Sequence, residues 1–306
     1  MISIAMTSYN GEKYIVDQLE SIRAQTIPPD EVIISDDGSS DNTVKIVEDY
    51  INRYGLKGWR IVENPKNLGY IKNFWKTILS TKGDYVFLAD QDDIWKQNKI
   101  ESMVSIMAKT SAMMLHTEVD VINNDREVIK KAMNNLSPGI RKLNLKKYMR
   151  KSHYCGMSSV LSGKMRSLME PLGTDCFPTH DWCLGVLSAL NDGFYTCSDV
   201  YSLRRSHGDN VALNINGAER KGIPQRIDTI KRYQDLYEAA DIISKQTEND
   251  RKNSKIIARF IEVSESRIES LESRSITNAL KNITALSYYP SPKAWVSDMM
   301  YLCGIF

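Results

Sequence analysis

The chain has 306 residues, of which 42% are hydrophobic and 25% are charged, as in a globular protein rather than a disordered or fibrous one. Its 40 Lys and Arg residues and 38 Asp and Glu residues leave a formal charge of +2, which argues against a nucleic-acid partner. The length suits one large domain or two of ordinary size.

The first residues and the cysteine pattern are those expected of a cytoplasmic protein. The first residues contain no basic leader or long apolar core, and no window holds the roughly 18 consecutive apolar residues of a membrane span. The 5 cysteines are odd in number and widely spaced, without a CxxC pair. This pattern favours reduced thiols over a disulfide framework or a zinc site. We therefore expect a cytoplasmic protein.

The first third of the chain alternates between two hydrophobic periods. Short apolar runs predict buried strands at Ile2–Met6, Glu31–Ser35, Arg60–Val62 and Tyr85–Leu88. Between them, helical spacing predicts a helix over 44–54 with Asp41 as its N-cap, and a shorter helix over 73–79. Strands alternating with such helices predict βαβ units and a parallel sheet, hence an α/β fold.

Polar residues follow all four predicted strands. They form the segments Thr7–Asn10, Asp36–Asp41, Asn64–Asn67 and Asp90–Asp93. Ligands of parallel sheets bind beyond the carboxyl ends of the strands, where the loops gather. The four segments therefore predict a single site at one edge of the sheet.

The rest of the chain has a different pattern. Between about residues 112 and 214 the alternation is lost, and we expect mixed strands and loops that complete the same sheet. Gly and Pro almost vanish between residues 225 and 289, where apolar residues recur with helical spacing. This region is expected to be a helical C-terminal extension.

Two acidic loops carry the chemistry. Asp90, Asp92 and Asp93 lie on a tight turn and can converge on Mg²⁺ or Mn²⁺, which prefer oxygen ligands and share them with phosphates. A solvated acidic turn is the alternative on this motif alone. Asp36 can accept hydrogen bonds from a nucleobase or a ribose, whereas a turn and a helix cap explain residues 39–41.

Several motifs, in this order and spacing, resemble those of family 2 glycosyltransferases with the GT-A fold. In the first 95 residues they are Thr7-Ser8-Tyr9-Asn10-Gly11-Glu12, Asp36–Thr43, Asn67-Leu68-Gly69 and Leu88–Trp95. Further along, His180-Asp181-Trp182 resembles the catalytic-base motif. Residues 204–211 resemble the segment that closes over the diphosphate in bacterial polysaccharide members. The helical remainder is similar to the tails of rhamnosyltransferases.

The resemblance implies a fold and an activity. A Rossmann-like, mostly parallel GT-A sheet flanked by helices would occupy residues 1–215, with a nucleotide-binding half at 1–95 and an acceptor half at 96–215. The helical extension would occupy 216–306. The activity would be inverting, metal-dependent transfer of a sugar from a nucleotide-sugar donor, dTDP-rhamnose or a UDP-hexose, to a saccharide acceptor. The setting would be bacterial surface polysaccharide or O-antigen synthesis.

The resemblance also implies a role for each matching residue. The donor would be bound by Thr7, Tyr9, Glu12, Asp36, Asp37, Asn67, Lys72, Asp90 and Gln91. Asp92 and His207 would hold Mn²⁺ or Mg²⁺, and Asp93 would support the loop. The acceptor or sugar pocket would be lined by His180, Trp182, Arg204 and Arg205.

Asp181 is the expected catalytic base. A carboxylate within hydrogen-bond reach of the acceptor hydroxyl can take its proton as C1 is attacked. The alternative is an ordinary first-turn residue that the helix dipole favours.

Other functions remain open at this point. A sugar nucleotidyltransferase is expected to have a glycine-rich basic phosphate loop, for which only residues 10–13 are available. A non-catalytic binding module is expected to lack the metal or base carboxylate, yet Asp92 and Asp181 are both present. A dehydrogenase is excluded because the GxGxxG motif is missing.

The aromatic and Met-rich tail, residues 295–306, has two interpretations. One is peripheral contact with the inner face of the cell membrane, which suits a lipid-linked acceptor. The other is packing on its own domain or on a second subunit of a homodimer.

Overall fold

The computed structural model describes residues 1–151, 154–174, 178–207, 222–247 and 251–305. Within these ranges ten strands form one sheet. Its first strands are β1 (Ile2–Ser8), β2 (Glu31–Asp36), β3 (Trp59–Glu63), β4 (Tyr85–Asp90) and β5 (Ile94–Trp95). The later strands are β6 (Met114–Ile122), β7 (Val128–Lys130), β8 (Ile140–Lys142), β9 (Ser159–Ser162) and β10 (Phe194–Arg205).

The strand order is β3-β2-β1-β4-β9-β6-β10-β5, with β7 paired to β6 and β8 to β10. Strands β1 to β4 pair in parallel, as do β6 and β10, whereas β9 is antiparallel to its neighbours β4 and β6. The sheet is therefore mixed and mostly parallel in its N-terminal half. This confirms the predicted α/β fold.

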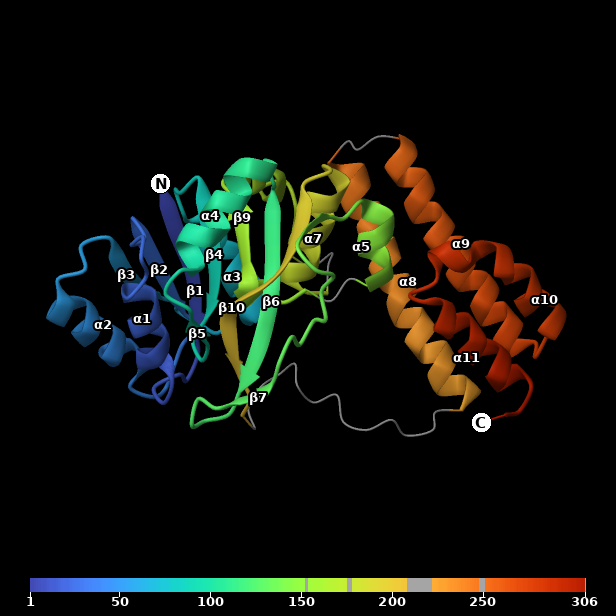
Figure 1. Ribbon diagram of the computed structural model, residues 1–306, viewed down its shortest axis with the longest axis horizontal. Coiled ribbons are helices and arrows are strands. Elements are labelled where there is room, and N and C mark those ends of the chain that lie inside the picture. Colours follow the sequence, from blue (N-terminus) through green and yellow to red (C-terminus); the bar gives the residue numbers. More distant parts are fainter. Residues whose placement is uncertain (152–153, 175–177, 208–221, 248–250, 306) are drawn as a thin grey trace.

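Helices cover both faces of the sheet and one end of the molecule (Figure 1). Those in the first two thirds are α1 (Ile15–Arg23), α2 (Thr43–Tyr54), α3 (Tyr70–Leu79), α4 (Lys99–Thr110), α5 (Leu145–Lys151), η1 (Gly156–Ser158), α6 (Met165–Met169) and α7 (His180–Leu190). The last third contains α8 (Ile223–Gln246), α9 (Arg251–Glu272), α10 (Ile276–Lys281), η2 (Asn282–Tyr288) and α11 (Pro292–Leu302).

The four strands predicted in the first third are present and extend one or two residues beyond the predicted ends. The prediction that all four are buried is wrong for β3. This strand lies at the edge of the sheet, and Val62 is 37% exposed. An edge strand has a neighbour on one side only, so its apolar run does not imply burial on both faces.

The predicted helix starts are also corrected. Helix α2 begins at Thr43, so Asn42 and not Asp41 occupies the N-cap position. Asp41 still accepts a hydrogen bond from the Thr43 N–H, at 3.0 Å. Helix α3 begins at Tyr70 rather than at residue 73, directly after Gly69, whose φ of +80° favours glycine.

The hydrophobic core lies on both faces of the sheet. On one face Ile4, Met6 and Phe87 pack with α1, α2 and α4. On the other face Ala5 and Leu88 belong to a cluster that includes residues of α3, α7, α8 and α9. The alternation along β1 and β4 explains this division, because successive side chains of a strand point to opposite faces.

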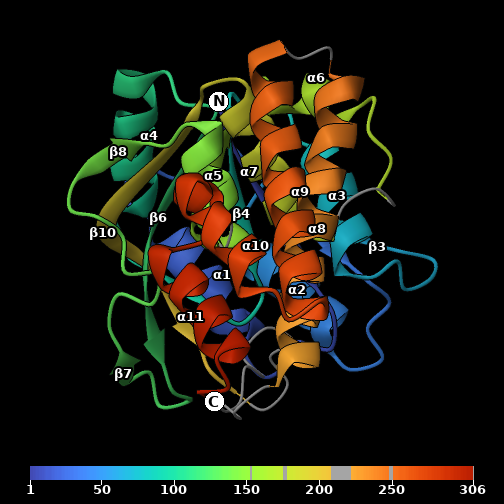
Figure 2. The same cartoon turned by 90° about the vertical axis from the view of Figure 1, so that its right-hand side faces the viewer.

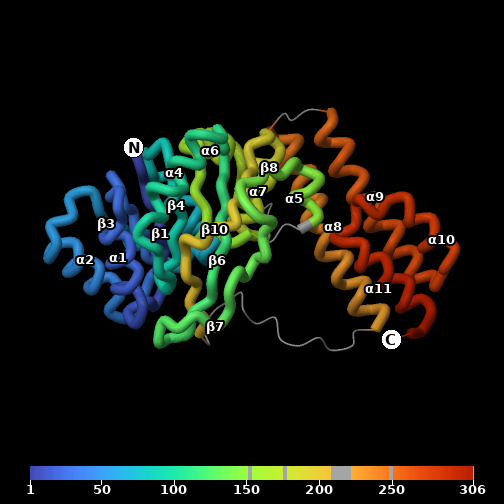
Figure 3. The backbone as a smooth tube through the Cα atoms, viewed as in Figure 1, coloured from blue at the N-terminus to red at the C-terminus, as the bar shows by residue number. Residues whose placement is uncertain are grey.

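The C-terminal helices share a core with the sheet. Tyr237 and Ile243 of α8 and Phe260 of α9 belong to the same cluster as Leu184 and Leu187 of α7. Figure 2 shows these helices packed in front of the sheet, and Figure 3 shows the chain running along the long axis from the N-terminus to this end. The proposed boundary near residue 215 lies outside the described residues.

Helix α11 is held on α8 and α9 by a buried ion cluster. Asp298 is 3% exposed. Its Oδ1 accepts a hydrogen bond from Arg226 Nε at 2.7 Å, and its Oδ2 accepts one from Arg267 Nε at 2.8 Å. The tail therefore packs on its own chain. Among the described residues, we find no helix with both the length and the hydrophobicity needed to span a bilayer.

Replacing Asp298 with Asn is expected to lower the free energy of unfolding by about 3–5 kcal/mol, because it leaves two guanidinium groups without their buried partner. Urea denaturation measures this loss. The control is Asp228→Asn, which breaks an exposed pair with Arg232 and is expected to cost about 0.5 kcal/mol or less. Equal losses in the two variants would mean that the ion cluster does not stabilise the C-terminal helices.

Candidate functional site

The loops that follow β1, β2 and β4 meet at one edge of the sheet. The register places Thr7 beside Asp90 and Ser8 beside Asp36. The polar strand ends predicted from sequence are therefore brought together. Thr7 is half-buried at this edge, whereas Lys72 is exposed on the first turn of α3.

The β1 loop is joined to the acidic turn by a pair of hydrogen bonds. Gln91 Oε1 accepts from the Tyr9 N–H at 2.8 Å, and Gln91 Nε2 donates to the Tyr9 carbonyl at 2.9 Å. A Cβ on Gly11 would lie 2.1 Å from Gln91 Oε1, so a larger residue there would displace the Gln91 side chain from these two bonds. The ring of Tyr9 remains 50% exposed, which leaves it available to a ligand.

The β1 loop is also joined to the loop after β2. Glu12 Oε2 accepts from the backbone N–H of Asn42 at 3.0 Å and from its side-chain amide at 2.9 Å. In return Asp41 Oδ2 accepts from the Glu12 N–H at 3.1 Å. Glu12 is exposed and lies on the surface of this edge.

Asp36 forms all its hydrogen bonds with protein groups. It is 0% exposed and accepts from Ser8 Oγ at 2.8 Å and from the Gly38 N–H at 3.1 Å. It also accepts from the N–H and Oγ of Ser39, at 2.7 and 2.6 Å. A nucleobase could reach this carboxylate only if these bonds opened. Asp36 therefore shapes the loop, and its predicted contact with a nucleobase stays a prediction.

Asp37 is likewise buried and hydrogen-bonded to groups of the protein. It is 3% exposed and accepts from the backbone N–H groups of Leu68 and Gly69 at 2.8 and 2.9 Å. Asp37 thereby fixes the loop that carries Asn67, whose Oδ1 accepts from the Gly69 N–H at 2.9 Å. Asn67 itself is exposed at the site edge.

Three carboxylates converge at the end of β4. Each of Asp90, Asp92 and Asp93 offers an oxygen, and these oxygens lie within 4.8 Å of one another. Asp93 is 1% exposed, and within the described part of the chain its Oδ2 has no hydrogen-bond partner. A buried oxygen without a partner costs free energy. A divalent cation would satisfy it, so the residues fit Mg²⁺ or Mn²⁺.

The electrostatics of the cluster agree with this fit. Burial, and then the charge of Asp92, raise the pKa of Asp90 to about 7. Burial, followed by the charges of Asp92 and Asp90, raises the pKa of Asp93 well above its usual range. Like charges this close disfavour ionisation of all three groups, and a bound cation would reverse the effect.

His207 lies beside this cluster, as the sequence predicted for a metal ligand. Its Nε2 is 2.7 Å from Asp92 Oδ2, and its ring stacks on Tyr14 with 4.8 Å between centroids. Asp92 and His207 are thus adjacent although one follows β4 and the other follows β10. Direct coordination by either residue stays a prediction.

Arg205 does not line a pocket, and that prediction is corrected. It is 1% exposed, and its Nε donates to the Asp92 carbonyl at 3.0 Å. One of its terminal nitrogens pairs with Asp17 of α1 at 2.8 Å. Arg205 therefore holds the acidic turn against α1. Arg204 is half-buried on the opposite face of the strand, where its charge offsets part of the rise in the pKa of Asp90 that burial and Asp92 cause.

Replacing Arg205 with Lys is expected to weaken Mn²⁺ binding about tenfold, because Lys cannot hold the Asp92 carbonyl and Asp17 together. Calorimetric titration of Mn²⁺ without a nucleotide measures the change. The control is Arg60→Lys on the edge strand β3, which alters the ion pair of the half-exposed Arg60 with Glu31 of β2 and is expected to bind Mn²⁺ normally. Normal Mn²⁺ affinity in Arg205→Lys would rule out a positioning role.

Asp181 lies in the first turn of α7, close enough to Asp90 for its charge to act on that carboxyl. Its Oδ1 accepts from the Trp182 N–H at 2.8 Å, and the side chain is half-buried. Its charge raises the pKa of both Asp90 and Tyr70, which indicates that it lies close to both. A carboxylate from a second element thus lies within electrostatic range of Asp90.

The two neighbours of Asp181 are buried, and their predicted role as pocket residues is corrected. Trp182 is 5% exposed and belongs to the core. His180 is 6% exposed and stacks on Phe74 with 4.2 Å between centroids. Both face the interior because α7 is apolar along almost its whole length and is buried on every side.

Two residues at the site were missed from sequence. Tyr70 is 49% exposed, lies edge-on to His180 at 6.1 Å and stands near Asp181, so it offers an aromatic surface there. Lys99 is fully buried behind the cluster, where its Nζ donates to the Met157 carbonyl at 2.8 Å. An exposed tyrosine and a buried lysine carry no local sequence signal, because only the tertiary fold determines their surroundings.

Comparison with known proteins agrees with this geometry. The family model for glycosyl transferase family 2 matches residues 3–167. The UDP-Glc:alpha-D-GlcNAc-diphosphoundecaprenol beta-1,3-glucosyltransferase WfgD of Escherichia coli is 29% identical over 214 residues, 67% of this chain and 78% of that protein. The dTDP-rhamnosyl transferase RfbG of Shigella flexneri is 36% identical over 110 residues, 35% of this chain and 38% of that protein.

Solved structures share the fold. Residues 1–349 of TarS from S. aureus, in complex with UDP, superpose with a TM-score of 0.62 at 15% identity, covering 99% of this chain and 91% of that one. The mannosyltransferase PcManGT of Pyrobaculum calidifontis, in complex with GDP-Man and Mn²⁺, gives 0.54 at 16% identity, covering 99% and 84%. These likenesses confirm the expected fold class.

Proposed function

We propose that this glycosyltransferase, a chain that belongs to glycosyl transferase family 2, transfers a sugar from a nucleotide-sugar donor to a saccharide acceptor with inversion at C1 and with a bound divalent cation. The observation that carries the proposal is the acidic cluster at the end of β4, with Asp181 of α7 close enough for its charge to act on Asp90. Such a transfer needs a cation site for the diphosphate of the donor and a separate carboxylate that can take the proton of the acceptor hydroxyl.

The metal site we propose consists of the three carboxylates and His207. Asp92 and His207 are the first candidates for direct ligands, and the orphaned Oδ2 of Asp93 offers a further one. When bound, Mn²⁺ or Mg²⁺ neutralises charge on the diphosphate of the leaving nucleotide. Arg205 keeps the turn in place through the Asp92 carbonyl.

The donor side we propose is formed by residues 1–95. Tyr9, Glu12, Asn67 and Lys72 are exposed around the edge where the strands end, and Thr7 is half-buried there. Asp36, Asp37 and Gln91 shape these loops by the hydrogen bonds described above. The donors we favour are dTDP-rhamnose and UDP-hexoses, in line with the substrates named for RfbG and WfgD.

The acceptor side we propose is formed by residues 96–215, followed by the helical extension 216–306. Asp181 takes the proton of the acceptor hydroxyl while that oxygen bonds to C1 and the bond from C1 to the diphosphate oxygen breaks. A single base and direct displacement invert C1. Tyr70 offers a ring surface against which an acceptor sugar can stack.

The acceptor we propose is a lipid-linked saccharide used in bacterial surface polysaccharide synthesis, at the inner face of the cell membrane. The support is the diphosphoundecaprenol acceptor in the name of WfgD, which shares 214 aligned residues with this chain. Helix α11 packs on α8 and α9. We therefore propose that any contact with the membrane or with a second subunit involves other surfaces of the C-terminal helices.

The test is a thermal-shift screen of the full chain with UDP-, dTDP-, GDP- and CMP-sugars, each with Mn²⁺ or with EDTA. A ligand at about 100 times its Kd stabilises the folded state by roughly 2.7 kcal/mol. We expect a metal-dependent shift with UDP- or dTDP-sugars and none with the others. No shift with any donor, or release of pyrophosphate from a nucleoside triphosphate and a sugar phosphate, would contradict the proposal.

A further inference from the structure

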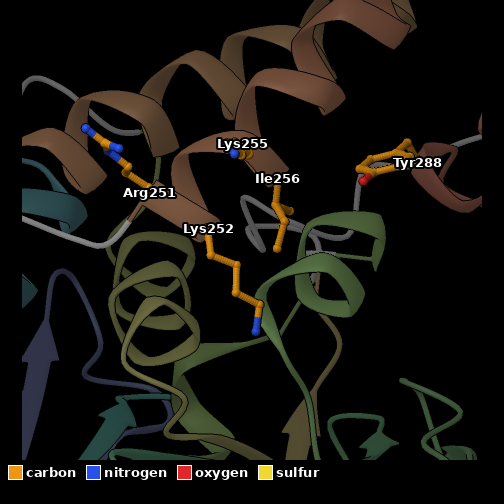
Figure 4. A pocket seen from close by; sticks show the side chains of 5 residues that line it. All are labelled: Arg251, Lys252, Lys255, Ile256 and Tyr288. Atoms are coloured by element: carbon orange, nitrogen blue, oxygen red, sulfur yellow. The ribbon is translucent and has the colours of Figure 1, made fainter.

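A pocket of about 500 Å³ lies on the C-terminal helices, away from the acidic cluster. It is lined by Arg251, Lys252, Lys255 and Ile256 of α9 and by Tyr288 of η2. Figure 4 shows Lys252 and Ile256 extending from the same side of α9, with Tyr288 across from Ile256. Three of the five lining residues are cations and none is an acid.

These cations lack counter-charges within the described residues. No carboxylate there forms an ion pair with Arg251, Lys252 or Lys255, although other charged residues of α9 pair within the helix, as Arg259 does with Glu262 at 2.7 Å. Uncompensated like charges around a hollow repel one another. An anion in the pocket would relieve this repulsion.

Helix α5 adds positive charge beside the pocket. Lys146 Nζ lies 3.7 Å from the centroid of the Tyr288 ring and donates to Ser287 Oγ at 2.9 Å. The sequence around it is unusual, because residues 128–169 contain ten Lys and Arg and no Asp or Glu, in a chain whose net charge is only +2. Lys146 thus brings one cation of this basic stretch beside the pocket.

The pocket lies at the far end of α7 from Asp181. Asn253 of α9, which follows Lys252, donates through Nδ2 to the Leu190 carbonyl at 3.0 Å, and Leu190 is the last residue of α7. Asp181 is in the first turn of the same helix. The 11 residues of α7 make it about 16 Å long, too far for one diphosphate to contact both ends.

We propose that this pocket binds the phosphate groups of an anionic ligand, at a site separate from the transfer site. The cations of α9 supply charge and hydrogen-bond donors for phosphate oxygens. Ile256 and the Tyr288 ring supply an apolar wall for the organic group that the phosphate carries. The ligand is either a free organic diphosphate or the headgroup of an anionic phospholipid, which share this chemistry.

The test compares the wild type with Lys252→Gln/Lys255→Gln, in EDTA and without a donor. Binding of inorganic pyrophosphate is measured by calorimetry, and binding to phosphatidylglycerol vesicles by co-sedimentation, with phosphatidylcholine vesicles for comparison. Loss of two cations is expected to weaken binding about 30-fold. The control is Lys231→Gln/Lys281→Gln, which removes two exposed lysines from α8 and α10 and is expected to bind as the wild type does.

The outcomes separate the two sources. Pyrophosphate binding that the double variant loses supports a free diphosphate, and loss confined to phosphatidylglycerol vesicles supports a lipid headgroup. Equal binding by wild type and double variant in both assays, or no binding by either, overturns the proposal. Sugar transfer by the double variant is expected to be normal in a soluble assay. Since the assay contains neither metal nor donor, its result is independent of the proposed function.

Discussion

Replacing Asp92 with Asn is expected to lower sugar transfer about 1,000-fold and to remove the Mn²⁺ dependence of donor binding. The variant keeps the size of the side chain but takes one charge from a cluster whose carboxylate oxygens lie within 4.8 Å. It also removes the charge that faces His207 Nε2 at 2.7 Å. A metal site that loses a charged ligand holds the cation and the diphosphate less tightly, which costs several kcal/mol in the transition state.

The measurement is donor affinity with and without Mn²⁺, together with the transfer rate. The control Asp235→Asn changes an exposed aspartate on α8 and is expected to behave as the wild type does. We expect Asp92→Asn to unfold at no lower temperature than the wild type without metal, because Asp90 and Asp93 then lose a repelling neighbour. Unchanged affinity with Mn²⁺ would remove Asp92 from the metal site.

Local sequence patterns were enough to locate the edge of the sheet at which the site lies. The apolar runs of β1, β2 and β4 end in polar residues, and a parallel sheet must bring such ends together. The same reasoning placed Asp90, Asp92 and Asp93 in one turn. The pairing of Asp92 with His207 was expected from the family resemblance and not from these local patterns.

The roles of individual side chains depended on contacts that the sequence does not encode locally. Arg204 and Arg205 are neighbours in β10, and only the register of that strand determines which faces the cluster and which is buried beneath it. Trp182 belongs to the core because α7 is buried on all sides. Asp36 looked free to bind a base, yet its partners are the side chain of Ser8 and a turn in its own loop.

The packing of the C-terminal helices could not be predicted from local sequence patterns either. Their helical spacing was evident from sequence, but their partners were not. The basic pocket exists because α9 packs beside α5 and η2, elements that lie far apart along the chain. Asp298 is likewise buried between two arginines from different helices. A charge pattern read along one segment predicts neither arrangement.

Replacing Asp181 with Asn is expected to leave donor affinity unchanged within about twofold and to lower transfer about 1,000-fold, the range of a lost general base. The amide keeps the hydrogen bond that Asp181 Oδ1 accepts from the Trp182 N–H, at 2.8 Å, so the start of α7 is preserved. What it removes is the group that can take a proton. Donor affinity by calorimetry and the rate of sugar transfer at saturating donor and acceptor separate these two effects.

The matched control is Asp192→Asn, just beyond the other end of α7, where the carboxylate is exposed and pairs with Lys142 at 3.6 Å. It is expected to transfer sugar as the wild type does. If Asp181 only stabilises the helix dipole, its Asn variant would lose about 1 kcal/mol or less of stability and keep its turnover. Loss of turnover with normal donor affinity and normal stability is the result that a catalytic base requires, and near-normal turnover would assign the base to another residue.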